Sequence, residues 1–316
     1  MPATAKSCSP SHRSASSIVT ESHCTRGAIS MSRRGFLKGS ANVVLASGLG
    51  GALLSACGGG DLDTELPETP RLASVSNFRD LAGVGAGYTT VDGKRMRRGA
   101  FYRANVLALS SADETAIDKL GIASVYDLRT PGEIARKDDV VPGGAAAQNL
   151  NVLGSSDFVV PEMNTTAAST AFMEAQARAY VTGAAQRAAY GTLLTRLADG
   201  AGAQLFHSNA GKDRAGWVAA LLLSIANVPL DVVMQDYLLS NTYLAASLDE
   251  QTKTLHAQDG EAAVAIQMPL LEVQESYLQA GFDQVQMSYG TMANYLTRGL
   301  GMSQTTIDTL RARLVS

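Results

Sequence analysis

Short apolar runs alternate with amphipathic segments from residue 98 to residue 240. Four runs, each bounded by glycine, proline or charge, predict strands at 98–103, 122–128, 148–152 and 203–207. Apolar residues at helical spacing predict helices at 111–119, 169–182, 185–198, 214–226 and 230–240, and three or four more over 243–315. This alternation predicts an α/β fold with a mostly parallel central sheet flanked by helices, followed by a helical C-terminal portion.

The segment 71–316 contains no repeat and no linker long enough to separate two domains, so we expect one domain. Periodicity is weakest over 151–168 and 253–269, which we expect to be mobile loops. Asp138 and Asp139 are expected on a surface turn. Trp217 lies at a core-facing helical position and is expected to pack in the core.

Charge and cysteine content divide the chain near residue 57. The first 57 residues hold six of the 26 basic side chains and one of the 29 acidic ones. The remainder has 20 basic and 28 acidic side chains, a net charge of −8, which excludes nucleic acid as an expected partner because phosphate neutralisation needs a basic face. All three cysteines (Cys8, Cys24, Cys57) precede the domain, which therefore has no disulfide and no cysteine nucleophile.

Residues 1–56 are predicted to be an export signal, which begins at Met1 or at Met31. The segment 33–38 (RRGFLK) precedes an uncharged, weakly apolar run and resembles the twin-arginine signal, which implies export in the folded state. Residues 54–57 (LSAC) resemble the bacterial lipobox, in which the cysteine is acylated and becomes the mature N-terminus. The alternative is a buried helix that carries an arginine pair by chance.

Residues 57–70 are then expected to form a lipidated N-terminus and a flexible acidic tether to the domain. The resulting expectation is an exported protein that is anchored to the cell envelope through lipid on Cys57. Gly58 follows that cysteine, where inner-membrane retention in Gram-negative bacteria usually has aspartate. Outer-membrane sorting is therefore favoured.

The loop between the predicted strand 203–207 and the helix that begins at Arg214 carries the candidate chemistry. Backbone N–H groups between a strand end and a helix N-terminus form an anion site. Gly211 permits close approach of the backbone, and Lys212 and Arg214 add charge and bidentate reach. The loop does not match a Walker A motif, a nucleophile elbow or a Ser-x-x-Lys pair, because Phe206 and Asp213 occupy positions that these motifs reserve for other residues and Ser208 lies four residues before Lys212.

The segment 207–216 (HSNAGKDRAG) is similar to the signature loop of cysteine-dependent phosphatases, His-Cys-x5-Arg. It resembles most closely the loop of bacterial atypical tyrosine and lipid phosphatases. Further family motifs match at 77–81 (NFRDL), 98–103 (RGAFYR), 120–133, 236–241 and 289–295. The resemblance covers about residues 74–314 and implies a tyrosine-phosphatase-like fold.

The resemblance also implies roles for individual residues. Ser208 stands at the position of the nucleophile, Asp213 at that of the general acid, and Arg214 at that of the phosphate-binding arginine. The remaining loop residues would bind phosphate; these are Asn209, Ala210, Gly211 and Lys212. Asp127 and Arg129 would flank the mouth of the site. No cofactor is implied, and no His/Asp/Glu cluster has the spacing of a metal site.

Serine at position 208 is the departure from the family pattern. A cysteine in such a loop ionises near neutral pH, whereas a serine needs a base, and His207 should point to the opposite face of the sheet. Three explanations remain: an engineered trap mutant, a slow serine enzyme, or a phosphatase-like domain that binds with little turnover. We expect phosphate-monoester binding, with a phosphorylated protein or a phosphoinositide as ligand and with hydrolysis lost or strongly reduced. The alternatives are an active tyrosine phosphatase and a non-catalytic binding or structural surface lipoprotein.

Overall fold

The computed structural model describes residues 69–316. The predicted export signal, the lipobox and nearly all of the tether lie outside the described residues. Within 69–316 no helix has the length and apolarity that a membrane span requires.

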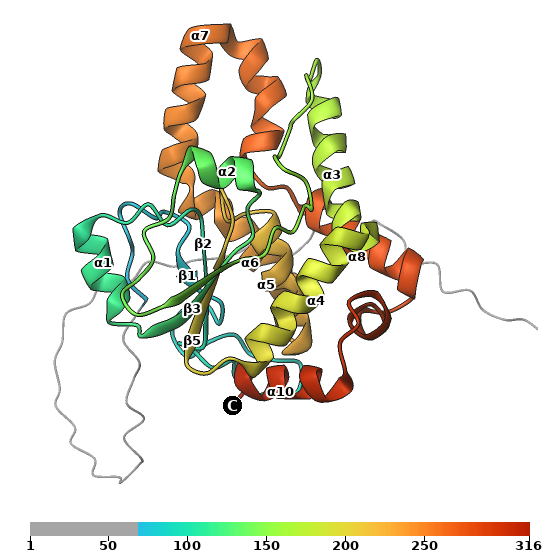
Figure 1. Ribbon diagram of the computed structural model, residues 1–316. Helices are drawn as coiled ribbons and strands as arrows, with labels where there is room; N and C mark the ends of the chain where they lie inside the picture. Colours follow the sequence, from blue (N-terminus) through green and yellow to red (C-terminus); the bar gives the residue numbers. More distant parts are fainter. Residues whose placement is uncertain (1–68) are drawn as a thin grey trace, which may run out of the picture. The chain divides into compact units, whose positions relative to one another are not determined.

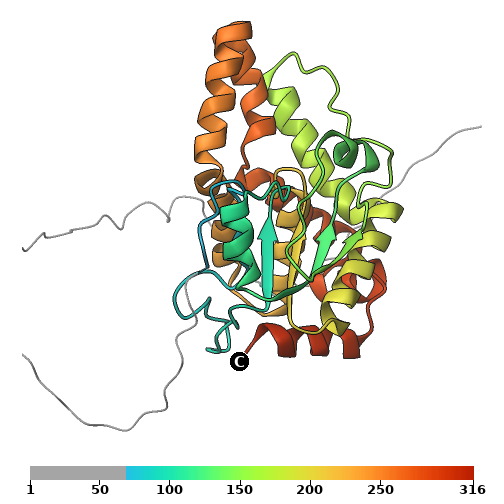
Figure 2. The ribbon, with the colours of Figure 1, turned by 60° about the vertical axis from the view of Figure 1, so that its left-hand side comes forward.

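A five-stranded sheet forms the centre of the domain, in the order β1-β2-β5-β3-β4 (Figures 1 and 2). The strands are β1 (Arg79–Asp80), β2 (Phe101–Ala104), β3 (Ile122–Asp127), β4 (Ala146–Asn149) and β5 (Ala203–His207). β2, β5, β3 and β4 pair in parallel with one another in that order, and β1 pairs antiparallel with β2. The predicted α/β fold with a mostly parallel sheet is confirmed, and β5 occupies its middle position.

Each face of the sheet is covered by a separate apolar cluster. The face that carries Phe101, Tyr126 and Phe206 packs on the larger helical layer, which includes α3, α4, α5 and α8. The opposite face carries Val125 and Leu205 and is covered by α1 and by the segment that leads into β1. Because side chains alternate along a strand, the three central strands β2, β5 and β3 each contribute to both clusters.

The predicted helices are all present, and the structure adds the short helix α2, which was not predicted. Those outside the C-terminal portion are α1 (Ser111–Asp118), α2 (Pro131–Arg136), α3 (Thr166–Thr182), α4 (Ala184–Asp199), α5 (Arg214–Ile225) and α6 (Leu230–Tyr243). The C-terminal portion contains α7 (Ala245–Leu271), α8 (Glu275–Tyr289), α9 (Met292–Asn294), the π-helix η1 (Tyr295–Gly299) and α10 (Gln304–Leu314). Trp217 on α5 is 1% exposed and packs against Phe282 and Tyr295, so the prediction that it belongs to the core is confirmed.

The prediction of a loop over 253–269 is wrong, because this segment lies within α7. Gly260, with φ 79° and ψ 179°, divides the helix into two legs. Figure 1 shows these legs as an arm beside α3, and Thr166 of α3 donates a hydrogen bond to Ala265 O at 2.9 Å. Most side chains of the arm are exposed or half-buried, which explains why the segment lacks a strong apolar period.

Candidate functional site

The 208–213 loop lies at the carboxyl edge of the parallel strands, which is where α/β folds bind ligands. It connects the central strand β5 to the N-terminus of α5. Ser208 is 2% exposed and Arg214 is 7% exposed, so both ends of the loop are anchored in the domain. The strand, the loop and the helix have the arrangement that the sequence indicated.

The carbonyl groups in the first half of this loop face outward, toward donors on neighbouring segments. Asn209 O accepts a hydrogen bond from Val106 N at 3.1 Å. Ala210 O accepts one from Asn77 Nδ2 at 3.0 Å. The segment before β1 and the segment after β2 therefore hold this half of the loop.

Arg103 on β2 holds the carbonyl groups of the second half. Its Nη2 lies 2.8 Å from Gly211 O and 3.5 Å from Lys212 O. A trans peptide is planar, so the N–H group of each following residue points away from these outward carbonyls. The N–H groups of residues 210–213 are thus turned toward the centre of the loop.

Within residues 69–316, the backbone N–H groups of 208–213 donate no hydrogen bond to another residue. Asp213 at the N-cap of α5 makes no side-chain cap bond either. Gly211 has φ +69°, and a Cβ there would lie 2.3 Å from Ala104 O, so only glycine fits. Unpaired N–H groups that converge at a helix N-terminus favour an anion with several oxygens, such as a phosphate group.

A buried ion pair fixes Arg103 in place. Its Nη1 lies 3.0 Å from Asp236 Oδ2 on α6, and its guanidinium is 0% exposed. Asp236 also faces Arg79 Nε at 3.6 Å and accepts a hydrogen bond from the hydroxyl of Tyr88 at 3.3 Å. Burial, and after it the charge of Arg79, lower the pKa of Arg103 to about 9, which leaves the side chain charged at neutral pH. The loop is therefore held by a charged network that joins β1, β2 and α6.

Arg214 pairs with Glu133 through two hydrogen bonds, each 2.6 Å long. Glu133 accepts a third hydrogen bond from the N–H of Thr130, in the capping box that begins α2. Burial by itself would raise the pKa of the Glu133 carboxyl. The hydrogen bonds and charge of Arg214, together with the hydrogen bonds from Thr130, outweigh this effect and hold the pKa below its usual 4.5. Such a bidentate pair fixes the plane of the guanidinium.

Lys212 and Asp213 contact each other. Lys212 Nζ lies 3.1 and 2.9 Å from the two carboxylate oxygens of Asp213. It also donates a hydrogen bond to Glu272 O, just after α7, at 3.1 Å. The side chain of Lys212 is 5% exposed and that of Asp213 is 23% exposed. The side chain of Asp213 therefore keeps some access to solvent.

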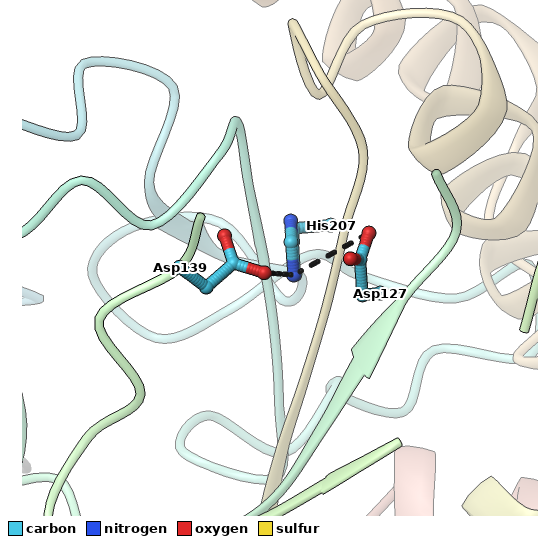
Figure 3. Close-up of side chains that lie close together, drawn as sticks. All are labelled: Asp127, Asp139 and His207. Atoms are coloured by element: carbon cyan, nitrogen blue, oxygen red, sulfur yellow. Dashed lines mark ion pairs between the residues drawn. The ribbon is translucent and has the colours of Figure 1, made fainter. Parts of the chain in front are cut away.

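Asp127, Asp139 and His207 lie close together on the face covered by α1 (Figure 3), and Arg129 completes a polar cluster with them. Arg129 Nε lies 2.9 Å from Asp127 Oδ1, and its Nη2 lies 2.6 Å from Asp139 Oδ2. His207 Nε2 lies 3.2 Å from Asp139 Oδ2 and 3.8 Å from Asp127 Oδ1. Asp127 and Arg129 are 8% and 0% exposed, so the structure places them under the loop and not at an open mouth.

The prediction of a surface turn is wrong for Asp139, whose side chain is only 12% exposed. The two carboxylates and the imidazole are close enough together to suggest a cation site. Arg129, however, already bonds both carboxylates, so the chain itself supplies the positive charge between them. The donor set therefore does not fit a metal ion, and the cluster supports the loop from below.

Among the described residues, none forms a hydrogen bond with the hydroxyl of Ser208. His207 shares the α1-side face with Leu205, and its Nε2 is directed at the carboxylates of the cluster. Within residues 69–316, His207 therefore points away from the loop, in agreement with the alternation expected along β5.

The comparison with known families covers this whole region. The sequence profile of the tyrosine phosphatase family matches residues 70–316. A Cupriavidus necator protein that carries the provisional name of a tyrosine-protein phosphatase is 35% identical over 254 residues, which cover 74% of this chain and 89% of the relative. The triple specificity protein phosphatase PtpB of Mycobacterium tuberculosis is 29% identical over 281 residues, which cover 77% of this chain and 98% of that protein. The chain belongs to the tyrosine phosphatase family.

Several site residues were not identified by sequence reasoning, although signals for some of them were present. Glu133 matched a family motif, and Thr130-Pro131 followed by Glu133 is a readable capping box, but nothing local showed that Glu133 pairs with Arg214. Arg103 lay in a predicted strand with no sign of its partner. Asp139 gave no signal at all, because its burial depends on segments that are remote in sequence.

Proposed function

We propose that this protein binds phosphate monoesters at the 208–213 loop and hydrolyses them slowly or not at all. The observation that supports this most directly is the orientation of the loop backbone. Four carbonyl groups of the loop accept hydrogen bonds from residues outside the loop, and the N–H groups on the opposite side of these peptides point inward. Such a cradle, with Arg214 fixed by Glu133, matches the three equatorial oxygens of a phosphoryl group. Family membership supports the same ligand class, either a phosphorylated protein or a phosphoinositide.

Slow hydrolysis is proposed because serine is not ionised near neutral pH and no residue within 69–316 forms a hydrogen bond with the hydroxyl of Ser208. Removal of a covalent nucleophile costs on the order of 10⁶ in rate, or about 8 kcal/mol at 1.36 kcal/mol per decade. The loop amides, Arg214 and Asp213 are retained, so the charge of the transition state would still be stabilised. The nucleophile is therefore the part of the family's machinery that this chain lacks.

The full chain and its Ser208→Cys variant should be compared in two assays. In the first, inorganic phosphate or vanadate should raise the melting temperature of both proteins, because a ligand that binds only the folded state stabilises it by mass action. Arg214→Lys keeps the charge but loses the bidentate geometry, so it should strongly reduce this shift. An unchanged melting temperature in the unmutated protein would contradict the proposal of an anion site.

In the second assay, the serine form should hydrolyse aryl phosphates barely above background. Ser208→Cys should gain an activity that iodoacetate abolishes. Robust turnover by the serine form that is lost in Ser208→Ala would instead establish a serine phosphatase. A Ser208→Cys variant that binds phosphate but stays inactive would favour a pure binding role, and absence of both binding and turnover would leave a structural role.

A further inference from the structure

Residues 83–98, here called the basic segment, lie at the amino edge of the sheet, at the end opposite to the 208–213 loop. The chain leaves β1 near the start of β2, because Asp80 pairs antiparallel with Tyr102, and the basic segment then leads back into β2. It therefore lies where the parallel strands begin. Figures 1 and 2 show the C-terminus at this end of the domain, whereas the α7 arm projects from the other end.

The charge of the basic segment is opposite to that of the domain around it. Residues 69–316 have 20 basic and 24 acidic side chains, but the basic segment has four basic side chains and one acidic one. The acidic one, Asp92, lies 3.4 Å from Nη2 of Arg311 on α10. Arg95 and Arg97 donate hydrogen bonds to backbone carbonyl groups, which leave the positive charge of each guanidinium in place.

Two valines project from the basic segment into solvent. Val84 is 72% exposed and Val91 is 67% exposed. Both lie in turns that neighbouring groups hold, because Arg98 Nη1 donates to Gly85 O at 3.2 Å and Val91 N donates to Asn227 O at 2.8 Å. Exposed apolar side chains beside cations match an anionic bilayer, whose head groups are negative and whose interior is apolar.

The start of the domain lies next to the basic segment. Thr69 lines one hollow together with Arg98 and Lys119, and it lines another together with Val84. The sequence predicts lipid on Cys57, which is 12 residues before Thr69. A chain of that length spans at most about 40 Å when fully extended. A bilayer that holds the predicted lipid is therefore within reach of the basic segment.

We propose that the basic segment docks on an anionic phospholipid bilayer and acts as a second attachment beside the lipid of Cys57. The cations bind the negative head groups, and the two valines enter the head-group region. Docking at the amino edge turns the 208–213 loop away from the bilayer. The ligands of the loop are then soluble molecules and not head groups of the same membrane. This inference goes beyond the proposed function and does not depend on phosphate binding.

Hydrogen exchange of the full chain tests this proposal with two kinds of vesicle. One is made of phosphatidylcholine, and the other of an equimolar mixture of phosphatidylcholine and phosphatidylglycerol. The mixed vesicles should slow exchange in residues 83–98 and leave residues 208–213 unchanged, whereas the neutral vesicles should slow neither. Concentrated salt should reverse the effect, because it screens the charges. Exchange is measured segment by segment, so binding through residues 1–68 does not contribute to the result.

A matched pair of double variants tests the role of charge. Lys94→Gln with Arg95→Gln should need about 25-fold more mixed vesicles for the same protection, since each cation near an anionic surface contributes about fivefold. Lys253→Gln with Arg298→Gln removes two exposed cations from the C-terminal portion and should behave as the unmutated protein does.

A matched pair of valines tests the apolar contact. Val84→Ser should weaken the protection of residues 83–98, whereas Val159→Ser should not, although Val159 is similarly exposed at 74%. The melting temperature of each variant shows whether its fold is intact.

Three results would overturn the proposal: no protection of residues 83–98 by mixed vesicles, equal protection by neutral vesicles, or protection of residues 208–213 in their place. Equal losses in the two double variants would overturn it as well. If soluble polyglutamate protects residues 83–98 and the vesicles do not, the surface binds an acidic protein and the assignment to lipid is wrong.

Discussion

Glu133 connects two parts of the domain through one carboxylate. The same side chain closes the capping box at the start of α2 and fixes the guanidinium of Arg214. Both side chains of the pair are nearly buried, at 4% and 9% exposure. Removal of one partner from a buried pair leaves an uncompensated charge, which costs about 3–5 kcal/mol.

The Glu133–Arg214 pair predicts a specific dependence of stability on pH. The pKa of Glu133 is lowered in the folded state, so its contribution is present above the unfolded value of about 4.5 and is lost as the pH falls through the folded pKa. Glu133→Gln should lower the melting temperature at pH 7, and the gap to the unmutated protein should narrow on acidification below about pH 5. Thermal unfolding from pH 7 to pH 3 measures this.

Asp249→Asn is the control for Glu133→Gln. It removes a carboxylate from an exposed pair with Lys253, whose side chains are 63% and 75% exposed, so no such gap is expected. If the difference in melting temperature between Glu133→Gln and the unmutated protein stayed constant from pH 7 to pH 3, this would contradict the assignment of the pH dependence to Glu133.

Single residues were predictable from sequence where local pattern determines them. Trp217 was assigned to the core from helical spacing alone, and Arg214 was placed at a helix start because an apolar helix follows it. Asp139 was assigned, together with Asp138, to a surface turn. Its burial comes from Arg129, His207 and the backbone of Leu107, none of which is close to it in sequence.

At the scale of elements, β5 and α5 were predicted almost to their ends, because each is a mostly apolar segment that is bounded by glycine or charged residues. β1 has only two residues, too few to show a period, and was missed. The prediction of β2 began three residues too early, and that of β4 two residues too late. The site depends on β5 and α5, so its position was predictable even where the sheet edges were not.

The tight contact between the 208–213 loop and β2 allows a substitution at Gly211 to test the role of the whole loop. Gly211→Ala combines a positive φ with a Cβ 2.3 Å from Ala104 O, so the loop has to move away from the strand. We expect a loss of at least about 1–3 kcal/mol in unfolding free energy, and we expect the phosphate-induced shift in melting temperature to disappear. Denaturant unfolding with and without phosphate measures both effects.

The Gly121→Ala variant separates the effect of backbone strain from the effect of a steric clash with the neighbouring strand. Gly121 also has a positive φ, +61°, but no heavy atom lies within 4 Å of the added Cβ. This variant should lose about 1 kcal/mol from backbone strain and keep the full response to phosphate. A Gly211→Ala protein that still responds to phosphate would contradict the role given to the loop backbone.

At the scale of the whole molecule, we expect the predicted lipid anchor to determine where the site operates. The predicted tether leads to the start of the domain at residue 71. We expect the mature protein to carry lipid on Cys57, and we expect Cys57→Ala to release or misprocess it, whereas Cys24→Ala should change nothing. Mass spectrometry of the mature N-terminus and fractionation of cells measure these outcomes. A soluble mature protein that begins elsewhere and carries no lipid would disprove the anchor.

The central place of β5 has a consequence for how the chain folds. β5 inserts between β2 and β3, pairing Phe101 with Gln204 and Val125 with Leu205, so the ladders at the middle of the sheet join partners that are far apart in sequence. Contacts between residues so far apart in sequence slow folding, because the long loops between them have to close, at a cost in chain entropy, before the stabilising contacts can form. Until β5 emerges from the ribosome, β2 and β3 both present open edges that can pair with other chains. If the chain is exported folded, as its arginine pair implies, β5 has to close this gap in the cytoplasm, before export begins.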